Sequence, residues 1–463
     1  MDPISNSSGQ LCRSFRKRDG IALVVSSVVG VGIFTTPGVV ANLVPQPSAI
    51  LALWLTGGVL PLVGAGCYAR LANLWPTAGG EYLYLSKSYG PAAGFLSGWT
   101  SLIAGFSGAT AASSVAVVMF AGQYFPRLAS SHPVIIKNLF GFEASLSSPS
   151  LAAAAIIVVF AVLHICSLST GKKVQGVLAL LLVGFILVFL GCGFSSNHGK
   201  WSNFHAPPTH FGPMNWLLAL IPVMFTYSGW NAAVYVAEEI HGSRKSMRPI
   251  LLGGTAIVVG LYTALNALYI YAIPAAQMHN SANIADAAAK VLFVAKTSVI
   301  TPVLIVALLG TISAMTIAGP RVYFAMARDG SFISTFARTS VRFRTPALAI
   351  ALQAVWSVVL VLLGRFEQIL MYSGFALVLS SGAAVAALFF VRQADAPARW
   401  TQMILPAVFV IASVAMVVNT IVKAPEIALV GVALIAAGIP VYGWGRRSRE
   451  VTYRLHAQEA AGD

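Results

Sequence analysis

Apolar runs of about 20 residues recur along the whole 463-residue chain, and short polar stretches separate them. A helix of that length crosses the hydrocarbon core of a bilayer, so the pattern predicts an all-α polytopic membrane protein with twelve transmembrane helices. We place these helices at residues 19–42, 48–70, 91–125, 150–168, 174–194, 213–238, 249–274, 298–328, 346–363, 366–391, 401–420 and 427–445, between an N-terminal tail over 1–18 and a C-terminal tail over 446–463.

The composition agrees with this pattern, because 57% of the residues are hydrophobic and only 9% are charged. The net charge of +15 would suggest a nucleic acid partner in a soluble protein. Here the bilayer explains it better. With a cytoplasmic N-terminus, most of the 29 Lys and Arg residues fall in cytoplasmic segments, and the positive-inside rule places both termini in the cytoplasm. We therefore expect the lipid bilayer, and no nucleic acid, as a partner.

Two of the predicted helices contain residues that interrupt a helix. The first carries "VVGVGIFTTPG" over residues 28–38, in which Gly30 and Gly32 permit unusual backbone angles. The sixth carries "FTYSGWNAAVYVAEEI" over residues 225–240, with Thr226, Tyr227, Ser228, Gly229 and Asn231 inside an apolar run. Unwound backbone survives in hydrocarbon only beside protein or a water-filled cavity, although small residues also serve helix packing alone. We expect both helices to be broken at the midplane.

Broken helices that open each half of a ten-helix pattern indicate an inverted-repeat transporter with a midplane binding site. The repeats would cover residues 19–194 and 213–391, and residues 401–445 would add two helices. We place no acidic or basic side chain at mid-membrane, so the pocket would hold a zwitterion through backbone dipoles, which fits a neutral amino acid. A cation bound on the aromatic face of Trp230 or Phe106 is the alternative.

Charged residues near the cytoplasmic ends suggest gating. Glu238 and Glu239 precede a basic loop containing Arg244, Lys245 and Arg248, which allows either solvated interfacial pairing or an inner gate. Arg321 either snorkels to the interface or joins a gate network.

The stretch over residues 274–295 predicts an external amphipathic helix that acts as a lid, with Asn283 as its cap.

The scattered His residues and the four Cys residues show no metal-ligand or disulfide spacing, so we expect no metal, no cofactor and no disulfide framework. An enzyme would need clustered catalytic groups at depth, and none is visible. A channel and a transporter-like sensor remain more remote alternatives. The interrupted helices favour an occluded binding site over a continuous pore.

These motifs resemble those of the amino acid-polyamine-organocation superfamily, most closely the L-type amino acid transporters and their bacterial relatives. Besides the two interrupted stretches, "PTAGGEYLYLSKSYGPAAGFLSGW" over 76–99 and "RVYFAMARDG" over 321–330 are similar to family segments. The resemblance covers residues from about 19 to 445. It implies a LeuT-type fold, a five-plus-five inverted repeat with two added helices, and alternating access.

The resemblance also implies the site residues. Amides around Gly30, Val31 and Gly32 would hold the substrate carboxylate, and the carbonyls of Val28, Phe225 and Ser228 would hold its ammonium. Phe225 would also be an aromatic lid, and the remaining neighbours would be Ser27, Tyr227, Gly229, Trp230 and Asn231.

Several features depart from the family pattern. Val31 replaces a frequent serine and keeps only its amide, and Arg70 stands where relatives often carry a glutamate. The outer loop over 126–149 has no cysteine, so we expect no disulfide-linked heavy subunit. We therefore expect a single-chain transporter in the plasma (inner) membrane of a prokaryote.

Leu182 stands where many relatives carry a helix-5 lysine, so a lysine proton switch is excluded. Sodium would find only Ser313 and Thr316 as hydroxyl ligands on helix 8, fewer oxygens than a hard cation prefers. We therefore expect cation-independent exchange of amino acids, with proton- or sodium-driven symport, or transport of cationic amino acids or polyamines, as alternatives.

Overall fold

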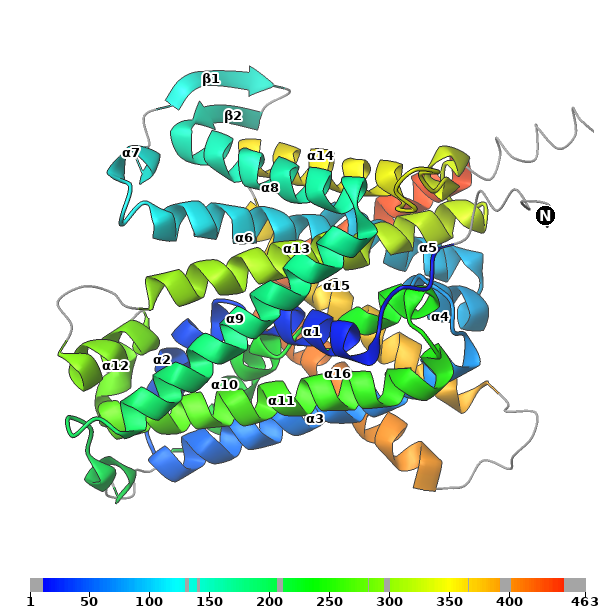
Figure 1. The fold of residues 1–463 in the computed structure, drawn as a ribbon. Coiled ribbons are helices and arrows are strands. Elements are labelled where there is room, and N and C mark those ends of the chain that lie inside the picture. Colours follow the sequence, from blue (N-terminus) through cyan, green and yellow to red (C-terminus); the bar gives the residue numbers. More distant parts are fainter. Residues whose placement is uncertain are drawn as a thin grey trace, which may run out of the picture.

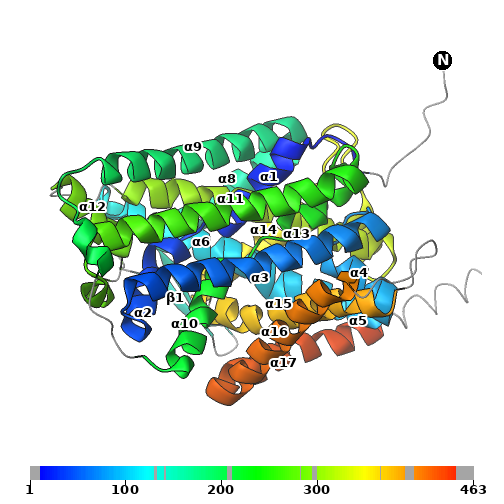
Figure 2. The same cartoon turned by 90° about the horizontal axis from the view of Figure 1, so that it is seen from below.

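A computed structural model describes the backbone of residues 11–129, 133–139, 142–205, 211–281, 283–294, 300–364, 366–391 and 401–444. Long helices lie side by side in one bundle, with α13 and α1 near its centre (Figure 1). In the view from below, α9 runs along one edge of the bundle, while α16 and α17 lie along the opposite edge (Figure 2).

The helices that build the first part of the bundle are α1 (Lys17–Val28), α2 (Gly32–Leu43), α3 (Pro47–Leu74), α4 (Glu81–Tyr89), α5 (Pro91–Thr100), the π-helical η1 (Ser101–Gly105), α6 (Phe106–Ala121), α7 (Pro126–Ala129), α8 (Ser148–Cys166) and α9 (Leu168–Phe194). The second part contains η2 (Trp201–His205), α10 (Pro213–Thr226), η3 (Ala232–Glu239), α11 (Ser243–Ala272), η4 (Ala275–Asn280), α12 (Ile284–Phe293), α13 (Thr301–Arg328), η5 (Ser334–Ala337), α14 (Ala347–Leu362), α15 (Phe366–Ala386), η6 (Ala387–Phe389), α16 (Thr401–Lys423) and α17 (Pro425–Ala436).

Within the described residues, eight helical segments are long and apolar enough to cross a membrane by themselves, and α1 and α2 together form a further, bent candidate. This confirms the predicted polytopic membrane protein. Three shorter apolar helices, over Pro213–Thr226, Ala347–Leu362 and Gly374–Phe389, fall where the remaining spans were expected.

Burial divides the spanning helices into a core and a periphery. In α13 and in the segment over Pro91–Ala121, 67% of the apolar 18-residue stretch is buried. The corresponding share is 28% in α8 and α9 and 17% in α16. The large exposed side chains in the middle of the peripheral helices are apolar, such as Val159 of α8 and Leu180 of α9. The peripheral helices therefore present apolar surfaces of the kind that contact lipid.

The segments outside the bundle differ in detail from the expected ones. Strands β1 (Pro133–Leu139) and β2 (Phe142–Ser147) form an antiparallel hairpin in the predicted outer loop. The stretch predicted as one amphipathic helix contains two helices, η4 and α12. The predicted cap of α12 is present, because the Asn283 side chain accepts a hydrogen bond from the backbone nitrogen of Asp286 (3.1 Å).

Candidate substrate-binding site

The first predicted interruption lies between α1 and α2. Helix α1 ends at Val28, α2 begins at Gly32, and the two are bent by 46°. Gly30, Val31 and Gly32 are partly exposed, whereas the flanking Val29 and Ile33 are fully buried. A Cβ atom placed on Gly30 would meet nothing within 4 Å. At Gly30 the turn therefore faces open space, between segments that are packed.

The second interruption separates α10 from η3, so the helix predicted over 213–238 is not continuous. Helix α10 ends at Thr226, and regular structure resumes as the 3-10 helix η3 at Ala232. Gly229 has φ +98°, which a residue with a side chain rarely adopts, and a Cβ atom there would lie 2.5 Å from the Ser27 carbonyl oxygen. Gly229 thus lets the two interruptions touch.

Side chains from neighbouring helices satisfy carbonyls that the interruptions expose. The Tyr262 hydroxyl of α11 donates to the carbonyl oxygens of Val28 (2.9 Å) and Thr226 (3.3 Å), one from each interruption. The Thr311 hydroxyl of α13 donates to the Ser26 carbonyl oxygen (3.2 Å). Such partners are what unwound backbone at membrane depth requires.

Helix α2, after the first interruption, and helix α10, before the second, also meet. The Thr226 hydroxyl donates to the Thr36 hydroxyl (3.0 Å), and a Cβ atom on Gly32 would lie 2.9 Å from the Thr226 side chain. Phe225 is 52% exposed and approaches Gly374 of α15. An exposed aromatic ring thus lies near the end of α10, beside α15.

Other predicted site residues brace the second interruption. Ser27 is buried, and its hydroxyl donates to the Leu23 carbonyl, whereas Ser228 is exposed. Tyr227 is buried, and its hydroxyl donates to the Trp54 carbonyl oxygen (3.0 Å).

Trp230 lies on the α3 and α16 side of this segment. Its ring packs against Tyr68, with ring centroids 4.8 Å apart, and against Phe409. The structure therefore gives Trp230 packing partners in the helix bundle.

Glu81, at the first position of α4, is a buried carboxylate that the sequence analysis did not assign to the site. Its oxygens accept hydrogen bonds from the Tyr68 hydroxyl (2.8 Å), the Asn231 side-chain amide and the Tyr235 hydroxyl. Asn231 therefore holds an acidic group next to the second interruption. The acidic residue in "GGEY" was the available signal, but the sequence did not show that α4 folds back against η3.

The end of η3 carries the predicted gating residues. Glu239 and Arg321 form a bidentate ion pair (2.7 and 3.1 Å), with side chains 0% and 2% exposed. Glu238 instead pairs with Arg328 of α13 (2.9 Å). Both acids thus bind α13 and not Arg244, Lys245 or Arg248, which lie in the first turns of α11, so of the two alternatives the described side chains do not show solvated pairing with these residues.

A short N-terminal segment closes over the same end of η3. The backbone nitrogens of Ser14 and Phe15 donate to the Glu239 carbonyl oxygen (2.8 and 2.9 Å). The backbone nitrogen of His241 donates in turn to the Phe15 carbonyl oxygen. Lys172 of α9 holds this segment through the Ser14 carbonyl (2.5 Å).

A further tyrosine bridges α4 to the end of α13. Burial raises the pKa of Tyr82 to about 12, so its hydroxyl stays protonated and donates to Asp329 Oδ2 (3.1 Å). The contact adds to the closure of this end of the bundle.

The candidate cation position shows competing interactions. Leu182 is fully buried on α9, which packs against α1 and α13. The Ser313 hydroxyl lies 3.0 Å from His164 Nε2, and the Thr316 hydroxyl donates to the Ile312 carbonyl of its own helix. Both hydroxyls considered as sodium ligands thus have protein partners, and the sequence did not reveal His164 as one of them.

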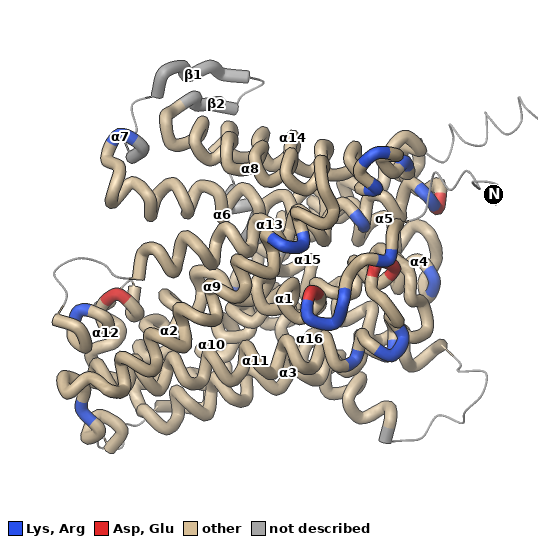
Figure 3. The backbone as a smooth tube through the Cα atoms, viewed as in Figure 1, with Lys and Arg blue, Asp and Glu red and all other residues tan. Residues whose placement is uncertain are grey.

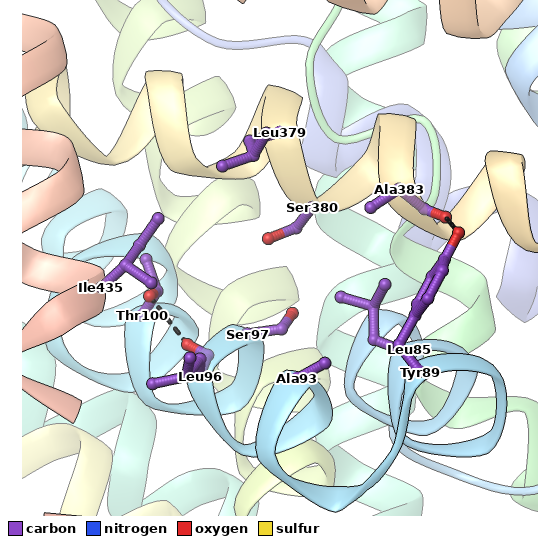
Figure 4. Close-up of a pocket in the computed structure, with 10 residues that line it drawn as sticks. All are labelled: Leu85, Tyr89, Ala93, Leu96, Ser97, Thr100, Leu379, Ser380, Ala383 and Ile435. Atoms are coloured by element: carbon purple, nitrogen blue, oxygen red, sulfur yellow. Dashed lines mark hydrogen bonds between the residues drawn. The ribbon is translucent and has the colours of Figure 1, made fainter. Parts of the chain in front are cut away.

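A separate cavity of about 260 Å³ lies between α4, α5, α15 and α17 (Figure 4). Its walls are mainly apolar, with Leu85, Leu96, Leu379 and Ile435 among them, and no charged side chain lines it. Its polar side chains are the hydroxyls of Tyr89, Ser97, Thr100 and Ser380, and none of its lining residues belongs to either helix interruption. It is therefore distinct from the site between the interruptions.

A family model described as amino acid permease matches residues 19–444. The serine/threonine exchanger SteT of Bacillus subtilis is 26% identical over 93% of this chain and 96% of that protein. The human b(0,+)-type amino acid transporter 1 is 26% identical over 94% and 90%, and the human cystine/glutamate transporter 25% over 95% and 87%.

These relatives are transporters and not enzymes, and their similarity extends over nearly the full chain. The match to the family model includes both interrupted segments and the ion pairs at the end of η3. The chain therefore belongs to the amino acid permease family of the amino acid-polyamine-organocation superfamily, and it is an amino acid transporter.

Proposed function

We propose that this protein exchanges neutral amino acids across the membrane by alternating access, with its substrate held between the two helix interruptions. The supporting observation is the contact between them, where Gly229 packs on the Ser27 carbonyl while Gly30, Val31 and Gly32 stay partly exposed. Backbone amides at the start of a helix attract a carboxylate, and carbonyls at the end of a helix attract an ammonium. A zwitterion presents both groups.

The substrate would be held mainly by backbone groups. Its carboxylate would accept from the amides of Gly30, Val31 and Gly32, and its ammonium would donate to the carbonyls of Val28, Phe225 and Ser228. The Tyr262 hydroxyl already donates to the Val28 carbonyl and fixes its direction, while the second lone pair of that oxygen is available to the ammonium. Phe225 would cover the bound substrate as the outer lid.

The wider architecture we propose is a LeuT-type fold of twelve transmembrane helices. Residues 19–194 and 213–391 would form the two inverted halves, and residues 401–445 the two added helices. The bent pair α1 and α2 and the interrupted pair α10 and η3 would then occupy equivalent positions, one at the start of each half.

The charge distribution supports a cytoplasmic location for both termini. Most of the described Lys and Arg residues lie at the end of the bundle that carries α4 and the start of α1, and fewer lie near α7 and α12 (Figure 3). The positive-inside rule assigns the first of these ends to the cytoplasm. We place the protein in the inner membrane of a prokaryote, without a disulfide-linked heavy subunit.

Under this orientation the structure is closed toward the cytoplasm. The ion pairs of Glu239 with Arg321 and of Glu238 with Arg328, together with the N-terminal segment, would form the inner gate. Substrate release to the cytoplasm then requires η3 to move away from α13.

Exchange is favoured over cation-driven symport by the residues around α9. Leu182 offers no charge, and the two candidate hydroxyls, of Ser313 and Thr316, supply fewer oxygens than a hard cation prefers. The name of the SteT relative, a serine/threonine exchanger, agrees with exchange of neutral amino acids.

Uptake into proteoliposomes tests the proposal directly. Labelled neutral, cationic and acidic amino acids would be offered to vesicles with and without internal substrate. We expect neutral amino acids to enter only when an exchangeable amino acid is present inside. Accumulation in empty vesicles driven by an imposed proton or sodium gradient would instead establish symport.

A further inference from the structure

A second cavity, of about 340 Å³, lies where the end of α8 meets the start of α9. Its lining residues come from three separate parts of the chain, namely Ser14 of the N-terminal segment, Cys166 to Ser169 and Lys172 around the α8–α9 junction, and Arg342 to Arg344 before α14. It is separate from the substrate-binding site, and the proposed transport mechanism makes no use of it.

The cavity is strongly basic. Lys172, Arg342 and Arg344 line it, and none of its lining residues is acidic. Within the part of the chain that the structure describes, none of these three cations forms an ion pair with a carboxylate, since Lys172 donates to a neutral carbonyl and Arg342 stacks on Phe343. Three uncompensated cations around one cavity favour an anionic ligand.

The fold holds these groups in position. The Thr345 hydroxyl donates to the Ile165 carbonyl oxygen (2.8 Å). This bond ties the segment over residues 341–345, here called the arginine loop, to the end of α8. Arg344 itself has φ +54°, and its backbone nitrogen donates to the Ser340 carbonyl (2.7 Å). At the other wall, Ser167 caps α9, whose first backbone amides point toward the cavity end of the helix.

The surroundings of the cavity indicate which anion it takes. Helices α8 and α9 are the lipid-facing helices identified above, and Val162 and Val177 expose apolar side chains close to their junction. On the arginine loop, Val341 is 95% exposed directly beside Arg342. Cations flanked by exposed apolar side chains match a phospholipid, whose phosphate lies above its acyl chains.

We propose that this cavity binds the phosphate group of an anionic phospholipid of the cytoplasmic leaflet, with Lys172, Arg342 and Arg344 as its ligands. The proposal rests on the membrane orientation given above and not on the identity of the transported amino acid. Guanidinium groups suit phosphate because their planar donors engage two oxygens at once.

The site has a direct connection to the inner gate. Lys172 donates to the Ser14 carbonyl, and the Ser14 and Phe15 backbone nitrogens donate to the Glu239 carbonyl. A phosphate beside Lys172 would hold the N-terminal segment in place. Anionic lipid is therefore expected to favour the closed state of the cytoplasmic side.

Lipid binding to the full-length protein tests this site. Wild type, the double variant R342Q/R344Q and the matched control R244Q/K245Q would be titrated with phosphatidylglycerol, and bound lipid would be counted by native mass spectrometry. The control removes the same charge from exposed positions of α11 outside the cavity. Phosphatidylcholine, inorganic phosphate and glycerol 3-phosphate are the comparison ligands, and melting temperature verifies the fold of each variant.

We expect phosphatidylglycerol affinity to fall about 30-fold in R342Q/R344Q, because each cation near an anionic membrane surface contributes about fivefold. The control should change clearly less, because Arg244 and Lys245 do not line the cavity. Equal affinity of the two double variants for phosphatidylglycerol would overturn the proposal. Displacement of phosphatidylglycerol from wild type by inorganic phosphate or glycerol 3-phosphate at equal concentration would also overturn it, since the site would then take free phosphate compounds.

Discussion

Replacing Tyr262 by phenylalanine removes a hydroxyl that contacts both helix interruptions. The ring is fully buried and packs against Trp54 and Tyr227, so the substitution keeps its shape and packing. Only the hydrogen bonds to the carbonyl oxygens of Val28 (2.9 Å) and Thr226 (3.3 Å) are lost. The change therefore isolates the contribution of this hydroxyl.

The magnitude follows from those two distances. The bond to Val28 is short, and leaving a buried carbonyl without a partner costs about 1–3 kcal/mol. The longer bond to Thr226 contributes less, so we expect a destabilisation of about 2 kcal/mol in total. If the Val28 carbonyl also holds the substrate ammonium, its loss of orientation should weaken substrate binding about tenfold, which corresponds to about 1.4 kcal/mol.

The chain offers a matched control on the same helix. Tyr269 is also fully buried in α11, and its hydroxyl has no hydrogen-bond partner among the described residues. Tyr269→Phe should therefore leave stability and affinity unchanged or slightly improved. Melting temperature in detergent and equilibrium binding of the transported amino acid would be measured for both variants.

The comparison between the variants decides the outcome. A loss of stability and affinity in Tyr262→Phe alone would support a carbonyl-positioning role. Equal behaviour of the two variants would refute it. Lower stability with wild-type affinity would show that Tyr262 supports the interruption but that the Val28 carbonyl does not contact the substrate.

Three further predictions concern the interruptions and the gate. Gly229→Ala should abolish transport, because its Cβ atom would lie 2.5 Å from the Ser27 carbonyl oxygen, and normal uptake by a folded variant would contradict this. Phe225→Ala should slow exchange more than it weakens equilibrium binding, as expected of a lid, whereas collapsed binding with normal turnover would make it a contact residue. Glu239→Gln leaves Arg321 buried without its carboxylate, so it should destabilise the closed inner end by about 3–5 kcal/mol; hydrogen exchange of residues 11–16 should accelerate, and unchanged exchange would argue against their role in the gate.

The sequence predicted the membrane helices because apolar runs of spanning length need no knowledge of tertiary packing. It also located both interrupted segments, since glycine, proline and polar residues inside an apolar run conflict with a continuous helix. The structure places a bend after Val28 and an end of helix at Thr226 within those segments. Local chemistry was sufficient for these features.

Pairing between distant residues was not accessible in the same way. Glu238 and Glu239 precede Arg244, Lys245 and Arg248 by only a few residues, so the sequence allowed pairing with these nearby cations. The structure instead pairs both acids with α13, more than 80 residues away in sequence. Glu81 shows the same limitation, because its hydrogen bond to Asn231 depends on α4 folding against η3.

Hydroxyl groups in membrane helices explain why the partners of the unwound backbone were also missed. A serine or threonine in a helix normally donates to a carbonyl of its own preceding turn, as Thr263 does to Val259 and Thr316 to Ile312. Thr311 lies at 3.2 Å both from the Ala307 carbonyl of its own helix and from the Ser26 carbonyl of α1. Residue type alone cannot separate the two cases, because each satisfies the hydroxyl equally well. The two cases differ in whether a neighbouring interrupted helix places a free carbonyl within reach of the hydroxyl. The interruption must therefore be located first, and only then can the hydroxyls that stabilise it be identified.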